Sequence, residues 1–209
     1  MIKMFLSRVR LDTNLRKTQI AFESPNLFHG AVETSFSDRQ RRNLWRIDKL
    51  MGQYYILILS EGRPCLDNFI QQFGYRGETG EIKKYDALLN RLDIDQKWRF
   101  RLVANPTRTI KNEKGERKIS AHVSEKYQLQ WLKEKAEKHG FEINEAMVVS
   151  SDWKIFKKKG TSSRVRLKEV AFEGSLTIKD LELFKDVLIR GIGRGKVYGM
   201  GMLTIVRGG

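Results

Sequence analysis

Cysteine, proline and histidine are scarce in this chain of 209 residues, which has one cysteine, three prolines and three histidines. The single thiol, Cys65, permits no disulfide within the chain and no metal site built from thiolates. No apolar run approaches the roughly 18 residues of a membrane-spanning helix. The opening sequence MIKMFLSRVRLD has no apolar stretch followed by a cleavage site, so we expect no signal peptide. These absences predict a cytoplasmic protein with no membrane partner.

Motifs for metal binding and nucleotide hydrolysis are also missing. The chain contains no HExxH and no run of acids spaced for two magnesium ions. Asp93 and Asp95 form an acidic pair, but it precedes a predicted strand without an identifiable partner. The segment GIGRGK lacks the ending of a P-loop and precedes a strand-like stretch instead of a helix. We therefore expect no metal and no cofactor.

Positive charge is what the chain has in excess. It carries 40 Lys and Arg against 25 Asp and Glu, for a formal net charge of +15. Such an excess indicates a polyanionic partner, most often nucleic acid. Hydrophobic residues make up 40% and aromatic residues 10%, which favours a packed core over disorder. The alternative is a basic protein whose charges are merely solvated.

The apolar patterns of the first half predict the element order β-α-β-β-α-β. Ser24 suits a helix N-cap and Pro25 suits the first helical position. Residues 12–19 and 74–80 are predicted loops, and 49–53 is the link of a hairpin. The strands are predicted over 4–11, 42–48, 54–60 and 97–105, and the helices from residue 24 and over 65–73.

The second half repeats nearly the same order with a hairpin added, although no residue-level repeat is visible. A helix is predicted over 125–139, with Ser124 as its N-cap and Gly140 after its end. Strands are predicted over 141–150, 153–159, 164–172 and 202–206, and a last helix over 178–189. We therefore predict an α+β protein of two tandem ferredoxin-like domains, residues 1–108 and 118–209, joined by a linker over 109–117.

The hairpin over residues 154–168 is the most positive element of the chain. Its tip is the sequence GTSS, and it contains no acid. A ribbon of this kind suits contacts with phosphates, which give salt-dependent affinity rather than sequence choice. The alternative is a solvated charged face. The cations are Lys154, Lys157, Lys158, Lys159, Arg164, Arg166 and Lys168.

A glycine-rich stretch, GIGRGKVYGMGML, covers residues 191–203. Glycines allow a backbone to approach a ligand closely, and successive N–H groups in such a loop suit phosphate oxygens. The alternative is a tight turn against which another backbone packs. The residues that we expect to contact nucleic acid are Gly193, Arg194, Gly195, Lys196 and Gly199.

Among the three histidines, His29 has the most suggestive setting. It lies early in the first predicted helix, at the border of an apolar face, with Asn26 and Glu33 as neighbours on the helix surface. A lone histidine is more often structural. His139 lies at a helix C-terminus, where a cation is favoured for structural reasons, and His122 has no assigned role.

Several stretches in sequence order resemble the CasE family, the CRISPR RNA-processing endoribonucleases of type I-E systems. They are MFLSRVRLD, SPNLFHGAV, WRFRLVANPTRTI, QLQWLKEKAEKHGF, VAFEGSLTI and GIGRGKVYGMGMLTI. The resemblance covers nearly the whole chain and also implies two tandem ferredoxin-like domains.

The resemblance implies cleavage of each repeat of precursor CRISPR RNA at the base of its stem-loop, without metal. The ribose 2′-hydroxyl attacks the adjacent phosphate and leaves a 2′,3′-cyclic phosphate and a 5′-hydroxyl. The family's catalytic histidine falls on His29, as general acid or general base. Similar enzymes often have a tyrosine three residues earlier, where this chain has Asn26, which can donate a hydrogen bond but does not readily transfer a proton.

The resemblance also implies partners. These are the CRISPR repeat stem-loop and the other protein subunits of the Cascade complex, to which such enzymes stay bound with their product. The sequence is compatible with a monomer in isolation. Two alternatives stay open, namely a non-catalytic stem-loop binder of the same fold and a basic DNA-binding regulator.

Overall fold

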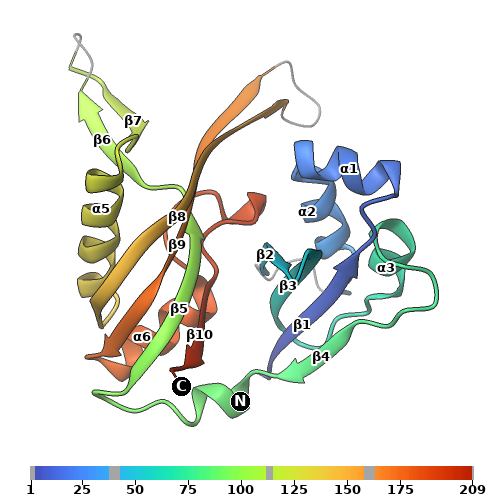
Figure 1. Cartoon of the computed structure of the whole chain (residues 1–209), viewed down its shortest axis with the longest axis horizontal. Helices are drawn as coiled ribbons and strands as arrows, with labels where there is room; N and C mark the ends of the chain where they lie inside the picture. The colour runs from blue at the N-terminus through green and yellow to red at the C-terminus, as the bar shows by residue number, and fades with distance from the viewer. Residues whose placement is uncertain (1–2, 38–42, 112–114, 158–162, 209) are drawn as a thin grey trace. The chain divides into compact units, whose positions relative to one another are not determined.

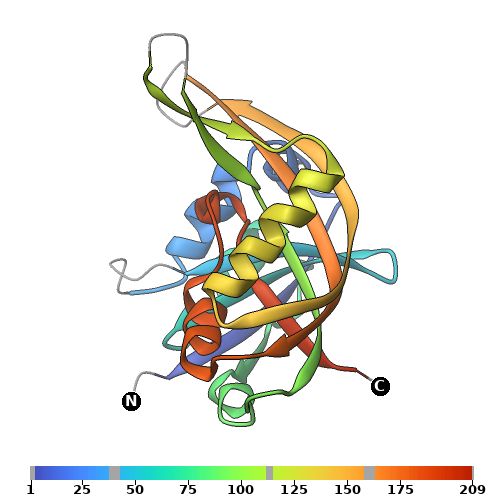
Figure 2. The same cartoon turned by 90° about the vertical axis from the view of Figure 1, so that its left-hand side faces the viewer.

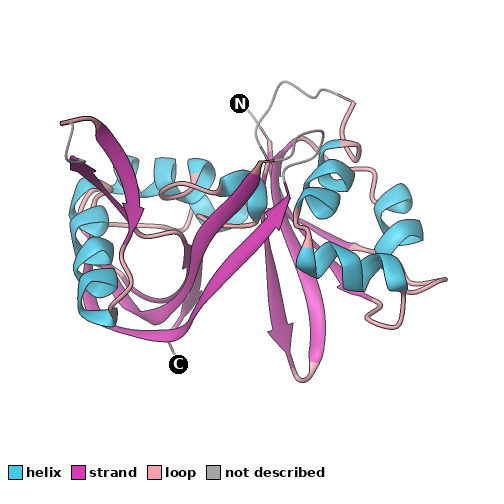
Figure 3. Ribbon diagram, turned by 90° about the horizontal axis from the view of Figure 1, so that it is seen from above, coloured by secondary structure: helices cyan, strands magenta, loops and turns pink. Residues whose placement is uncertain are grey.

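The chain folds into two compact units, described by a computed structural model over residues 3–37, 43–111, 115–157 and 163–208 (Figure 1). Unit 1 comprises Met1–Arg91, Phe156–Val165 and Val197–Gly199, and unit 2 comprises Leu92–Ile155, Arg166–Lys196 and Met200–Gly209. Each unit contains one four-stranded sheet, and helices gather on one face of each sheet (Figure 3).

The sheet of unit 1 has the order β2-β3-β1-β4. Its strands are β1 (Met4–Leu11), β2 (Leu44–Leu50), β3 (Gln53–Glu61) and β4 (Glu81–Lys84). All three pairings are antiparallel. Strands β2 and β3 form the predicted hairpin, because Met51 and Gly52 both adopt positive φ, at 48° and 79°, as a tight two-residue turn requires.

In the described part of unit 1 this sheet is accompanied by the helices α1 (Arg16–Glu23), α2 (Asn26–Glu33), α3 (Asp67–Phe73) and the short α4 (Asp86–Leu89). Helix α2 buries Phe28, Ala31 and Val32, whose spacing places them on one helical face. Phe28 packs against Phe73 with ring centroids 5.0 Å apart, and against Trp45 at 6.1 Å. These contacts anchor α2 in the aromatic core of unit 1.

The sheet of unit 2 has the order β10-β5-β9-β8. Its strands are β5 (Lys97–Ala104), β8 (Phe141–Lys157), β9 (Arg164–Ile178) and β10 (Leu203–Arg207). Helix α5 (Glu125–Lys138) lies over one face of this sheet (Figure 2), where Trp131 stacks on Phe172 at 6.3 Å. The remaining elements are β6 (Thr107–Lys111), β7 (Arg117–Ala121), α6 (Leu181–Arg190) and the 3₁₀ turn η1 (Lys196–Tyr198).

Both sheets place their four main strands in the spatial order fourth, first, third, second, which is ferredoxin-like. The predicted fold class is therefore confirmed. The division of the chain differs from the prediction, since it falls after Arg91 and not within 109–117. Strand β5, which the sequence pattern assigns to the first domain, pairs with β9 and β10 in unit 2.

Local differences have identifiable causes. The sequence patterns miss strand β4 because its sequence, EIKK, is a short sheet edge that buries no residue fully. The predicted loop 12–19 contains much of α1, whose buried residues, Thr18 and Ala21, are too small to give an apolar signal. Ser24 consequently ends α1 and does not cap α2. Residues 109–111 of the expected linker belong to strand β6, and residue 117 begins β7, with which β6 pairs.

Other elements agree more closely with their predictions. Helix α5 begins after Ser124 and is followed by Gly140 at φ +73°. The three strand-like pieces over 141–172 are two long strands, β8 and β9. Helix α6 begins at Leu181 rather than 178, because Ile178 still belongs to β9 and Asp180 caps the helix by accepting a hydrogen bond from Leu183 N. Within the described residues no helix is long and apolar enough to cross a membrane.

Candidate functional site

His29 lies on α2 in unit 1, immediately after the buried Phe28, and its side chain is partly exposed. Its Nδ1 atom is buried and has no hydrogen-bond partner among the described residues. The other ring nitrogen, Nε2, is not buried in this way, and it forms no hydrogen bond with the described residues. The imidazole therefore presents Nε2 at the surface and keeps Nδ1 inside.

Asn26 links α2 to the end of strand β8. Its side-chain Nδ2 donates a hydrogen bond of 3.1 Å to the carbonyl oxygen of Lys157, 131 residues further along the chain. Asn26 precedes His29 by three residues, so the two side chains are neighbours on the helix surface. The Lys157 carbonyl is thus held at a residue one helical turn from the histidine, and the Lys157 side chain is exposed.

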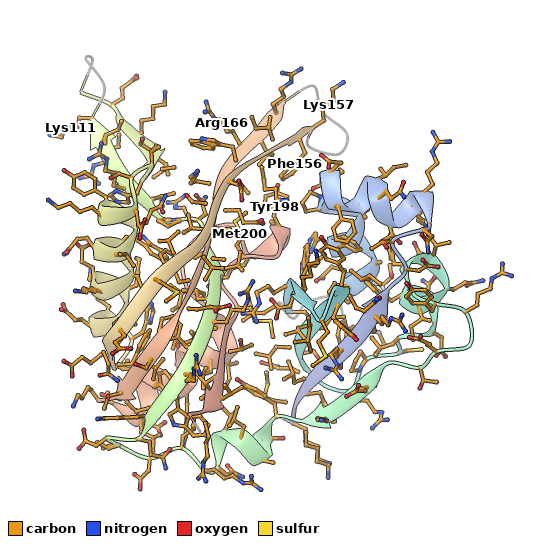
Figure 4. The ribbon with its side chains drawn as sticks, in the orientation of Figure 1. Lys111, Phe156, Lys157, Arg166, Tyr198 and Met200 are labelled. Carbon is orange, nitrogen blue, oxygen red and sulfur yellow. The ribbon has the colours of Figure 1, made fainter. Side chains whose placement is uncertain are left out.

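A third segment of unit 1, Val197–Gly199, packs against Trp45 of β2, which in turn contacts the same helix. Gly199 is buried at φ +82°, and a Cβ at this position would lie 2.7 Å from Cζ3 of Trp45. Only glycine fits there without strain. The Trp45 ring in turn contacts Phe28, the residue before His29. Tyr198 meets Phe156 edge to face with ring centroids 4.9 Å apart, as Figure 4 labels them.

These contacts bring together three stretches that are far apart in the sequence: α2, the end of β8 and the Gly-rich segment. Sequence patterns predict four residues of this cluster separately but do not predict their association. The four are His29, Asn26, Lys157 and Gly199. Three aromatic residues have no place in the predicted site, because an aromatic residue in a strand or loop is normally assigned to the core. Only the tertiary contacts distinguish Trp45, Phe156 and Tyr198.

The rest of the Gly-rich stretch belongs to unit 2, where much of its backbone is bonded to the protein itself. Ile192 N donates to Gly201 O at 2.8 Å, and Gly201 N donates to Val103 O at 2.6 Å. A Cβ on Gly201 would lie 2.5 Å from Ile192 O. The alternative interpretation, a turn packed closely against backbone, is therefore correct for these positions. Gly193, Gly195 and Lys196 are partly buried and Arg194 is exposed.

The cations of the predicted hairpin differ in their surroundings. Lys157 and Arg164 are exposed. Arg166 is exposed and stacks on the Trp153 ring, with its Cζ 4.0 Å from the centroid. Lys154 Nζ lies 3.7 Å from Glu169 Oε1, an acid just outside the predicted hairpin. Lys158 and Lys159 lie outside the described residues.

Lys168 is a correction to the prediction. Its side chain is only 6% exposed, and its Nζ donates a hydrogen bond of 2.8 Å to Ser151 O. A buried ammonium is retained only where it is paired or hydrogen-bonded. Lys168 therefore holds β9 to β8 and is not available to a phosphate at the surface.

The other two histidines belong to unit 2. Burial lowers the pKa of His139, and the positive charge of Lys135 acts in the same direction. Burial likewise lowers the pKa of His122, with a further contribution from Arg108. Neither histidine shares unit 1 with the β8 end and the 197–199 segment. Among the described residues, no group of three or more His, Cys, Asp or Glu side chains is placed to hold a metal ion.

The fold and the site together define an α+β protein of two ferredoxin-like units, with a partly exposed histidine beside the end of a basic strand. A sequence model of the family described as CRISPR associated protein matches residues 4–207. The chain therefore belongs to the CRISPR-associated protein family represented by that model, and the predicted resemblance is confirmed.

Individual relatives extend this finding. The CRISPR-associated endoribonuclease Cse3 of Thermus thermophilus is 26% identical over 216 residues, which cover 97% of this chain and 99% of the relative. The structure of Thermus thermophilus Cse3 bound to an RNA representing a pre-cleavage complex matches with a TM-score of 0.80 at 23% identity, covering 98% of this chain and 99% of the other. A chain of the CRISPR RNA-guided surveillance complex, pre-nicking, matches with a TM-score of 0.73 at 24% identity, covering 97% and 99%.

Proposed function

We propose that this protein is an endoribonuclease that cleaves precursor CRISPR RNA at the base of the repeat stem-loop and remains bound to the product as a subunit of Cascade. The observation that carries the proposal is the surface-facing Nε2 of His29, held one helical turn from the Asn26–Lys157 hydrogen bond. The name of the Thermus relative supports the activity. The match to a surveillance-complex chain supports the assembly.

The proposed reaction is a transesterification within the RNA. The ribose 2′-hydroxyl loses its proton, and its oxygen forms a bond to the adjacent phosphorus. The bond from phosphorus to the 5′ oxygen breaks, and that oxygen gains a proton. The products are a 2′,3′-cyclic phosphate and a 5′-hydroxyl. His29 Nε2 either accepts the first proton or supplies the second, a contribution of about 10²–10⁴-fold.

Neighbouring groups support this chemistry. The exposed Lys157 ammonium suits the negative charge that grows on the phosphate oxygens in the transition state. The amide of Asn26 is engaged with the Lys157 carbonyl. Its proposed role is therefore to fix the β8 end beside His29 and not to transfer a proton. Arg164 and Arg166 are exposed further along the hairpin and suit the phosphates of the RNA.

The test is cleavage of an end-labelled repeat stem-loop in excess EDTA, with the product ends mapped. We expect one cut that leaves a 2′,3′-cyclic phosphate. A 2′-deoxy sugar on the 5′ side of the cut should abolish cleavage and preserve binding. Loss of cleavage in EDTA with recovery on adding magnesium would contradict the proposed chemistry. Tight binding without any cut would instead indicate a stem-loop-binding assembly subunit.

A further inference from the structure

The β6–β7 hairpin of unit 2 is a second basic ribbon, separate from the β8–β9 hairpin. Its two strands pair only with each other in the described structure, and they extend beyond the end of α5 (Figures 1 and 2). An isolated two-stranded ribbon is marginally stable in water. It carries four exposed cations, Arg108, Lys111, Arg117 and Lys118.

The arrangement of these cations is unfavourable in the protein alone. Lys111 lies directly opposite Arg117 in the strand register, and like charges in such pairs destabilise a sheet. None of the four cations forms an ion pair with a carboxylate of the described residues. The label in Figure 4 places Lys111 near the far end of the ribbon. A polyanion bound along the ribbon would relieve this repulsion.

An aromatic platform lies at the other end of the ribbon. The rings of His122 and Tyr127 are stacked, with centroids 6.0 Å apart and planes inclined by 29°. Tyr127 is 52% exposed. Because desolvation lowers the pKa of the His122 imidazole, the neutral ring is favoured, which suits stacking. The platform therefore presents an exposed π-surface at the base of the ribbon, where Arg108 is the nearest of the four cations.

The backbone around this platform is firmly held. His122 N donates to Pro106 O at 2.9 Å. The buried Gln128 side chain donates from Nε2 to the carbonyl oxygens of His122 and Val123, each at 3.0 Å. The ring pair is therefore fixed relative to the ribbon base and needs little ordering when a partner binds.

We propose that the β6–β7 ribbon and the His122–Tyr127 platform bind single-stranded RNA that flanks the stem-loop. Exposed rings stack unpaired bases, whereas bases within a duplex are already stacked. The ribbon cations contact the phosphates of the same strand. Strand β6 has five residues, about 17 Å of extended backbone, which accommodates a few nucleotides. This inference rests on the proposed function, because it takes the stem-loop as bound elsewhere on the protein.

The experiment compares two RNAs: the repeat stem-loop alone and the same stem-loop with a tail of about ten uridines, a length within single-strand site sizes. Tails at the 5′ and 3′ ends are tested separately. We expect one tail to tighten binding. The variant Lys111→Thr/Arg117→Thr should remove that gain, because a Thr–Thr pair suits the ribbon but bears no charge. Affinity for the bare stem-loop should stay within about two-fold of wild type.

The platform is tested with Tyr127→Ala and Tyr127→Phe. We expect Tyr127→Ala to weaken binding of the tailed RNA by about ten-fold, within the range for one base stacked on a ring. Tyr127→Phe keeps the ring and should bind like wild type. A matched control, Lys83→Thr/Lys84→Thr, removes two exposed strand cations from unit 1 and should preserve the tail effect.

Three results would overturn this inference while leaving the proposed function intact. These are no gain from either tail, a gain that survives Lys111→Thr/Arg117→Thr, or an equal loss of affinity for the bare and the tailed RNA. The last would indicate contact with the stem itself. If an acidic protein, and not single-stranded RNA, competed for binding to the ribbon, the ribbon would be assigned to a protein partner. Failure of the wild-type protein to bind the bare stem-loop would refute the proposed function itself.

Discussion

Helix α2 of unit 1 and helix α5 of unit 2 each carry a polar group that is buried, but only the group on α5 is hydrogen-bonded. On α5, Gln128 is fully buried, and its amide is bonded to two carbonyl groups and to Ser151 Oγ. On α2, His29 has a buried Nδ1 with no partner in the described structure. The satisfied group joins α5 to β8 and to the ribbon base, whereas the unsatisfied one contributes no bond to the fold.

This difference helps to distinguish polar side chains that stabilise the fold from those that serve a function. An unpaired buried polar atom costs free energy, so a folded protein retains one when something else requires it. The criterion is not sufficient by itself, because Ser7 Oγ, Asn43 Oδ1 and Trp45 Nε1 are also buried without partners among the described residues. His29 differs from these in residue type, because imidazole is the side chain that enzymes use most often as a general acid or base.

The largest predicted effect is on His29. We expect His29→Ala to slow cleavage by about 10²–10⁴-fold, the usual contribution of a general acid or base. Single-turnover cleavage of labelled stem-loop RNA measures the rate, and a filter-binding titration should show affinity within about two-fold of wild type. Urea unfolding should show little loss of stability, since the ring nitrogens make no bond within the described structure. His139→Ala is the matched control and should cleave normally.

Gln128→Met should have the opposite effect to His29→Ala, with lower stability and an unchanged rate of cleavage. The thioether fills a similar volume but leaves the carbonyl oxygens of His122 and Val123 without their donor, at an expected cost of about 2–3 kcal/mol in the free energy of unfolding. Urea denaturation followed by circular dichroism measures this change. Cleavage of the bare stem-loop by the folded protein should remain at the wild-type rate. A stable variant with impaired cleavage would break the comparison between the two helices.

Asn26→Ala should have an intermediate effect on cleavage. Loss of the hydrogen bond to Lys157 O frees the end of β8, and we expect the single-turnover rate to fall by up to about ten-fold, the contribution of one such bond. Asn26→Asp retains the size but lacks the N–H donor, so it should be at least as slow. Wild-type cleavage by Asn26→Asp would show that the bond does not position the site.

The smallest effects compare two cations that the sequence placed in one group. Arg164→Ala should weaken stem-loop binding a few-fold and reduce the slope of log K against log salt by about 0.7–0.9, as for one lost phosphate contact. Lys168→Met should leave the slope unchanged and lower stability, because the lost contact is internal. Equal salt slopes for the two variants would contradict the distinction between an exposed and a buried cation.

Much of this protein is determined by local sequence. An alternating apolar pattern specified strand β1, and the apolar face of α2 specified which side of that helix enters the core. Net charge indicated a polyanionic partner. The order of elements was sufficient to predict the ferredoxin-like fold, and the resemblance located His29.

Tertiary structure decided the rest, because the deciding interactions join residues far apart in the chain. Strand β5 could not be assigned to its sheet from its own pattern, since either unit offers an apolar partner. Its pairing with β9 places it in the sheet of unit 2. The burial of Lys168 and the hydrogen bond of Asn26 to Lys157 have no local signature. Sequence determined which side chains this protein has available for binding and proton transfer, and only long-range packing decided which of them reach the surface together.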